Sequence, residues 1–70
     1  MGTKRFTDRT YRSSYGDWVK VTRDNKDRTF THAFGRRNEI QAERIQTLPF
    51  KWISNWKEAE DCANRFLAAS

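Results

Sequence analysis

An apolar stripe near the C-terminus constrains the fold more than any other feature of the chain. Its members recur at helical spacing: Trp56, Ala59, Cys62, Ala63, Phe66 and Leu67. This spacing predicts a helix with one apolar side. Asn55 is a suitable N-cap, and Glu58 three residues later fits a capping box. Such a helix needs a layer to pack against, and a small sheet needs such a helix to be stable.

Two runs of alternating residues, 18–23 and 28–34, predict a β-hairpin in front of this helix. The segment between them, Asp24-Asn25-Lys26-Asp27, is typical of a turn. Because side chains alternate across a strand, one face receives apolar residues and the other mostly polar ones. We expect the core to contain Val19, Val21, Phe30 and Phe34. We expect the outer face to carry Trp18, Lys20, Thr22, Thr29 and Thr31.

The remaining segments give weaker signals. Residues 50–53 are interpreted as a third strand, whereas residues 35–49 fit either a short irregular helix or a long loop. Residues 1–14 are basic and polar, which fits a flexible arm or an ordinary frayed terminus. The expected fold is α+β: a small three-stranded antiparallel sheet packed by one C-terminal helix. A basic arm over residues 1–14 would precede a single domain over residues 15–70.

The chain of 70 residues is long enough for one small domain, and its ten aromatic residues supply core material. The single cysteine excludes an internal disulfide. No apolar run approaches the length of a membrane span. The first residues lack the hydrophobic stretch of a signal peptide, so a cytoplasmic protein without membrane contact is expected.

Little in the sequence supports catalysis. His32 is the only histidine and falls within a predicted strand, and Cys62 falls on the apolar stripe as a small core residue. The acids near residue 60 resemble helix-start residues more than a metal site, and no glycine-rich phosphate loop is present. We therefore expect neither an enzyme, a metal site nor a cofactor.

Positive charge is concentrated in the first half of the chain. The formal net charge is +5, and residues 1–37 alone carry ten Lys or Arg against four acids. This asymmetry is typical of proteins that bind a polyanion, although solubility alone also explains a basic surface. A basic sheet face with an exposed aromatic can contact phosphates and bases. The candidate nucleic-acid-binding residues are Trp18, Lys20, Thr22, Arg23, Lys26, Arg28, Thr31, Arg36 and Arg37.

The segment from Trp56 to Phe66, with Tyr11-Arg12 and Gly16-Asp17-Trp18-Val19, resembles the three-stranded-sheet DNA-binding domains of plant ethylene-response factors. The arm-binding amino-terminal domains of tyrosine recombinases are similar in design. The resemblance spans roughly residues 11–67. It implies that the sheet enters the major groove of DNA, and that the contacts come from Trp18, Lys20, Thr22, Arg28 and Thr31.

These observations predict a small basic nucleic-acid-binding protein whose partner is duplex DNA, acting as a regulator or recombination accessory factor. The alternative is a small protein-binding module or inhibitor of a host enzyme, of the kind found in phages, since Trp and Arg are also enriched in protein interfaces. A structural or ribosome-associated role is a third reading.

Overall fold

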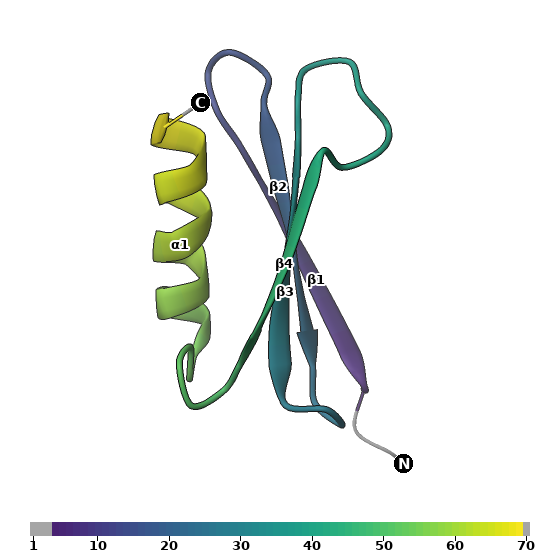
Figure 1. Cartoon of the computed structure of the whole chain (residues 1–70), viewed down its shortest axis with the longest axis vertical. Coiled ribbons are helices and arrows are strands. Elements are labelled where there is room, and N and C mark those ends of the chain that lie inside the picture. The colour runs from purple at the N-terminus through teal and green to yellow at the C-terminus, as the bar shows by residue number, and fades with distance from the viewer. Residues whose placement is uncertain (1–3, 70) are drawn as a thin grey trace.

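A computed structural model describes residues 4–69, which form four strands and one helix. The strands are β1 (Phe6–Arg12), β2 (Trp18–Asp24), β3 (Thr29–Gly35) and β4 (Arg44–Pro49), and the helix is α1 (Trp56–Ala69). All neighbouring strands are antiparallel, and their order in the sheet is β1-β2-β3-β4. The helix lies along one face of the twisted sheet, and the other face is left open (Figure 1).

The predicted hairpin and helix are confirmed. Trp18 pairs with Gly35 and Asp24 with Thr29 across the β2–β3 hairpin, which matches the predicted strands closely. The helix begins at Trp56, and the Asn55 side chain accepts a hydrogen bond of 2.9 Å from the Glu58 backbone N–H. This bond satisfies one of the free N–H groups at the start of the helix.

The prediction of a three-stranded sheet is wrong, because the sheet has four strands. Residues 6–12, expected within a flexible arm, form the edge strand β1. Residues 44–49, expected in an irregular segment, form the other edge strand β4. Residues 50–53, predicted as the third strand, form a turn in which Trp52 and Ile53 both donate backbone hydrogen bonds to the Pro49 carbonyl. Residues 1–3 of the expected arm, and residue 70, lie outside the described part of the chain.

Both missed strands lack the apolar alternation by which strands are recognised. In β1 the two large apolar residues, Phe6 and Tyr11, are five positions apart and therefore point to opposite faces. In β4, Ile45 and Leu48 are three positions apart and therefore also point to opposite faces. Edge strands are commonly short and charged, which limits pairing with other chains, and this composition conceals them in the sequence.

The core lies between α1 and the sheet. Val19, Val21 and Phe30 are fully buried and Phe34 is nearly so, which confirms the predicted core face. Ile53, Ala59 and Ala63 complete it. The Phe30 ring lies 5.3 Å from the rings of both Phe50 and Trp56, measured between centroids. Aromatic burial of this kind supplies a large part of the stabilisation available to so small a domain.

The helix covers only part of its face of the sheet. Within residues 4–69 it packs against β1, β2 and β3, and its backbone does not approach β4. The consequence is a groove between α1 and β4, described below, on the same side of the sheet as the helix. Within residues 4–69, α1 is the one helix. It is not long and apolar enough to cross a membrane.

Candidate nucleic-acid interface

The face of the sheet turned away from α1, called the open face here, is defined by the strand register. Cross-strand partners share a face, so the residues opposite Trp18, Lys20 and Thr22 belong to it as well. Its members are Phe6, Asp8, Thr10, Arg12, Trp18, Lys20, Thr22, Asp24, Thr29, Thr31, Ala33, Gly35, Ile45, Thr47 and Pro49. No described element of the chain packs over the middle of this face.

A row of three hydroxyl groups and one carboxylate crosses the middle of the open face. Asp8, Thr22, Thr31 and Thr47 lie side by side on the four strands. The Thr22 hydroxyl donates to Asp8 Oδ1 at 2.8 Å, and the hydroxyls of Thr31 and Thr47 are 3.0 Å apart. The row is short and polar, and its hydroxyls can exchange hydrogen bonds with a ligand that is laid across the sheet.

Trp18 occupies one end of the open face in a fixed orientation. Its indole lies on Gly35, its cross-strand partner, so closely that a methyl group at that position would collide with the ring. The indole Nε1–H donates to the Glu39 carbonyl oxygen at 3.2 Å. A strand glycine often marks such a close approach. Because residue 35 has no side chain, the indole ring can lie flat against the sheet at this position.

A hollow of about 500 Å³ opens beside this ring. It is bounded by strands β1 and β2, by the turn that joins them, and by the loop over residues 36–43. Its lining residues are Thr10, Arg12, Gly16, Trp18, Lys20, Asn38, Glu39 and Ile40. The lining thus combines an aromatic ring, two cations, one acid, a hydroxyl and an amide in one open depression.

The charges of the open face are partly compensated. Lys20 Nζ lies 3.8 Å from Asp8 Oδ2, a surface ion pair between two half-exposed side chains. Such pairs contribute little stability, about 0–1 kcal/mol, so Lys20 can be recruited by a ligand. Arg12 is exposed and makes no ion pair with the residues that the structure describes. Arg12 is therefore available to a ligand at this end of the face, with Lys20 beside it, and the exposed Arg37 lies nearby with its side chain against Gly16.

At the other end of the face Asp24 organises the β2–β3 turn. Its carboxylate accepts hydrogen bonds from the Arg5 guanidinium and from the backbone N–H groups of Lys26 and Asp27. The Arg5 hydrogen bond, assisted by those two backbone groups, holds the pKa of the Asp24 carboxyl below its ordinary value. Asp24 is thus a structural acid that fixes the turn and is already satisfied by its neighbours.

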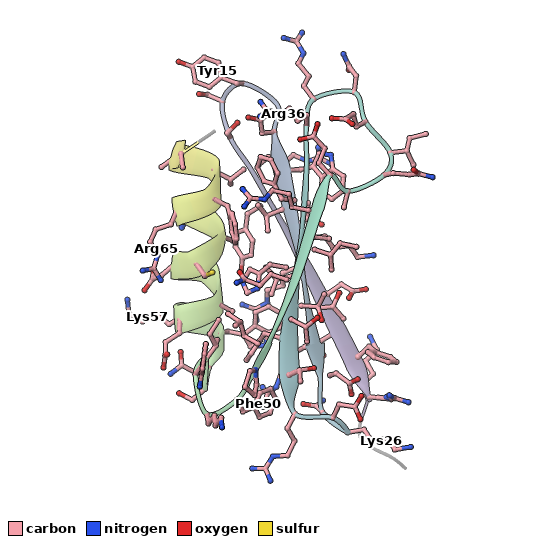
Figure 2. All side chains as sticks on the ribbon, viewed as in Figure 1. Tyr15, Lys26, Arg36, Phe50, Lys57 and Arg65 are labelled. Atoms are coloured by element: carbon pink, nitrogen blue, oxygen red, sulfur yellow. The ribbon has the colours of Figure 1, made fainter. Side chains whose placement is uncertain are left out.

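The sequence-predicted site residues fall into three groups. Trp18, Lys20, Thr22 and Thr31 share the open face. Lys26 and Arg28 lie at the β2–β3 turn, and Arg36 and Arg37 lie beyond the opposite end of the hairpin. Figure 2 shows Lys26 and Arg36 at the two ends of the molecule. Apart from Arg23, the predicted residues therefore form one face flanked by two cationic ends.

Arg23 is the predicted site residue that does not belong to this surface. It pairs with Phe30 across the hairpin and so points toward α1. Its guanidinium carbon lies 5.1 Å from the Phe50 ring centroid and 5.8 Å from that of Phe30. Its position beside the turn suggested a phosphate contact, but the alternation of the strand places it on the core side, where it covers aromatic rings.

Several residues of the open face were missed by the sequence reasoning. Arg12 and Thr10 lie in β1, and Thr47 and Ile45 in β4, so their place depended on recognising the two edge strands. Arg36 is also less available than the sequence suggested, because its Nε lies 3.1 Å from Glu43 Oε2. No local signal marks Arg12, because both faces of β1 are mostly polar.

The described residues that bear on metal, histidine and thiol chemistry are placed as follows. Within residues 4–69 no group of three His, Cys, Asp or Glu side chains is arranged to hold a metal ion. His32 is buried, and its Nε2 lies 3.0 Å from the Ala59 carbonyl oxygen. A carbonyl only accepts, so Nε2 carries the proton. Burial raises the pKa of the Cys62 thiol, which disfavours the reactive thiolate.

A second hollow, of about 280 Å³, is the groove left between α1 and β4. Its lining residues are His32, Phe34, Arg44, Ile45, Gln46 and Phe66. The neighbouring strand β4 is an edge of the sheet, with Ile45 69% exposed, and the preceding loop presents Ile40 at 96% exposure. Strand β4 thus offers a free sheet edge with two exposed isoleucines near it.

Comparisons with protein-family models, with curated proteins and with solved structures found no match to this chain. The resemblance to the ethylene-response-factor and recombinase domains therefore stays a prediction. The four-stranded sheet differs from the three-stranded design that the resemblance implied.

Proposed function

We propose that the protein binds nucleic acid through the open face of its sheet. The observation that carries this proposal is the combination of an uncovered face and its chemistry. A fixed indole lies beside Arg12 and Lys20, a row of hydroxyls crosses the centre, and cationic turns flank both ends. These are the groups that contact bases, sugars and phosphates in protein–nucleic-acid complexes.

The size of the face agrees with this function. Strand β2 has seven residues, which corresponds to a length of about 23 Å at roughly 3.3 Å per residue. A nucleic-acid segment of the same length would span the face from one cationic turn to the other. Phosphates at both ends of such a segment are within reach of the cationic turns. The overall charge of +5 adds a long-range attraction to any polyanion.

A charge-matched pair of variants tests the proposal. Arg12→Gln with Lys20→Gln removes two positive charges from the open face. Lys57→Gln with Arg65→Gln removes two from the outer side of α1, where both side chains project away from the sheet (Figure 2). Affinity for labelled duplex DNA, single-stranded DNA and RNA is measured by fluorescence anisotropy at several salt concentrations.

The open-face variant is expected to bind all three nucleic acids more weakly. The slope of the logarithm of the binding constant against the logarithm of the salt concentration should fall in magnitude by about 1–2, since each lost phosphate contact changes it by about 0.9. The helix variant should change both quantities much less. Equal losses in the two variants would show attraction to net charge without a site, and no binding at low salt would refute the proposal.

The exposed edge of β4 favours a second candidate, a protein-binding module that acts as an inhibitor or adaptor. An extended segment of a partner can add a strand to a free sheet edge, and Ile40 and Ile45 offer apolar contacts beside it. An Ile45→Lys variant separates the two functions. Loss of a specific protein from a nuclease-treated pull-down, with oligonucleotide affinity unchanged or raised by the added charge, would support this candidate.

A further inference from the structure

The hollow beside Trp18 has the construction of a ligand site for a flat ring. One side of the indole is packed on Gly35, and its Nε1–H is fixed on the Glu39 carbonyl. The ring therefore cannot turn to follow a ligand. An aromatic side chain held in this way loses little conformational freedom on binding, which is the condition for an efficient stacking platform.

The loop over residues 36–43 forms a wall next to this platform. It leans to the side of the sheet away from α1, which is the side of the open face (Figure 1). Asn38 and Ile40 line the hollow from this loop, and Ile40 is 96% exposed. The loop thus rises above the open face beside Trp18 like a step, and the hollow lies where the sheet and the loop meet.

Two cations lie within reach of the same hollow. Arg12 is the cross-strand partner of Trp18, and Lys20 follows two positions along β2 on the same face. Side chains that are direct cross-strand partners have Cβ atoms about 4.5–5.5 Å apart. A ring placed on the indole would therefore have its attached phosphate groups close to a guanidinium and an ammonium group.

We infer that this hollow binds one unstacked base of a single-stranded nucleic acid, with the base on the indole of Trp18 and its phosphates at Arg12 and Lys20. The inference rests on the proposed function and specifies the form of nucleic acid. A base inside a duplex is stacked on both sides and exposes only its edges in the grooves. The projecting loop also keeps a duplex from lying flat along the whole face, whereas a single strand can follow the step.

Three probes of equal length test the inference. They are a thymidine oligonucleotide of about 12 nucleotides, within the site sizes of sheet-type single-strand binders, the same phosphate backbone without bases, and a duplex of mixed sequence. Affinity is measured by anisotropy at low salt. The full-length protein should bind the thymidine strand about 5- to 150-fold more tightly than the abasic strand, the range expected for one stacked base.

Two variants locate the effect at Trp18. Trp18→Leu removes the ring, and Gly35→Ala leaves the ring in the chain but displaces it from its position on the sheet. Each should abolish the preference for the thymidine strand over the abasic strand. Trp52→Leu is the matched control, because Trp52 is 67% exposed and lies outside the hollow. Circular dichroism establishes that each variant is folded.

The outcomes separate the inference from the proposed function. If wild-type protein binds the thymidine and abasic strands equally, with a steep salt dependence, the stacking site is refuted and charge-driven binding stands. Tighter binding to the duplex that is insensitive to both variants also overturns the inference. Binding of none of the three probes at low salt refutes the proposed function itself. If Trp18→Leu does not fold, Gly35→Ala and the abasic strand still decide the question.

Discussion

On strand β2 the residues directed toward α1 include Val19 and Val21, both fully buried, whereas those directed away include Trp18, Lys20 and Thr22. Neighbouring positions of one strand therefore lie in opposite environments, one buried against the helix and the other open. The covered face carries the apolar contacts that hold the domain together. The open face carries hydroxyls, cations and one indole that the core does not need.

This comparison teaches that a domain of 70 residues can separate folding from recognition by using the two sides of a single sheet. Substitutions on the covered face should change stability and leave the binding chemistry intact. Substitutions on the open face should do the reverse. The exceptions lie where a charged residue serves the core, as Arg9 and Arg23 do, and these positions show where the separation is incomplete.

The strongest test of the comparison uses adjacent residues of β3. Phe30→Ala removes a fully buried ring that contacts Phe50 and Trp56, and should lower the free energy of unfolding by about 3–5 kcal/mol. Thr31→Ala, on the open face, removes one exposed hydrogen bond to Thr47 and should cost about 1 kcal/mol or less. Urea unfolding followed by circular dichroism measures both.

Because small domains have a total stability near the low end of about 5–15 kcal/mol, Phe30→Ala should retain only about 0–2 kcal/mol and unfold at very low urea concentration. Equal midpoints for the two variants would show that the open face is part of the core, and the proposed separation would fail.

The next effect concerns the helix that covers one face. Asn55→Ala removes the side-chain acceptor for the Glu58 N–H and should lower the free energy of unfolding by about 1 kcal/mol. Asn64→Ala is the matched control, since Asn64 is exposed in the middle of α1, where alanine favours the helix. Thermal unfolding should show a lower midpoint only for Asn55→Ala, with oligonucleotide affinity unchanged in both variants at a temperature where they are folded.

Two arginines of β1 sharpen the comparison, because replacing either by glutamine gives the same net charge. Arg9 points toward α1, and its guanidinium carbon lies 4.3 Å from the Trp56 ring centroid. Arg12 points to the open face. Arg9→Gln should cost about 0.5–1 kcal/mol of stability, the usual size of an exposed cation–π contact. Arg12→Gln should leave stability almost unchanged and weaken oligonucleotide binding more than Arg9→Gln does. The reverse ranking would contradict the assignment of faces.

The sequence contained enough information for the covered face but not for the sheet edges. Val19, Val21, Phe30 and Phe34 were predicted as core residues because two adjacent strands placed their apolar residues on one face, and the structure confirms all four. Strands β1 and β4 were missed because each has one large apolar residue on each of its two faces, so that neither face is recognisably apolar. Their pairing is decided by the neighbouring strand, which supplies hydrogen bonds that local sequence cannot indicate.

The candidate site shows the same division. Trp18, Lys20, Thr22 and Thr31 were placed together by alternation alone. Arg12 required β1, and the hollow required the loop that brings Glu39 to the indole. The flat seat of Trp18 on Gly35 depends on cross-strand register, which becomes visible only once the hairpin is built.

The smallest expected effect lies at the turn end of the open face, where Asp24 accepts hydrogen bonds from Arg5. Because the Arg5 hydrogen bond lowers the pKa of this carboxyl in the folded protein, the unfolded chain binds a proton more readily than the folded one. The contribution of the pair is therefore complete above the unfolded-state pKa of about 4 and is lost as pH falls through the lower folded-state pKa.

Asp24→Asn should thus reduce stability near neutral pH, and the difference from wild type should shrink as pH falls below about 4. The control Asp27→Asn removes only the 3.8 Å contact to Arg5 and keeps the Asp24 pair, so it should retain the wild-type loss of stability in acid. Urea unfolding at a series of pH values measures this. A constant difference between Asp24→Asn and wild type across that range would mean that the charge of Asp24 does not hold the turn, and that its geometry alone does so through the N–H groups of Lys26 and Asp27.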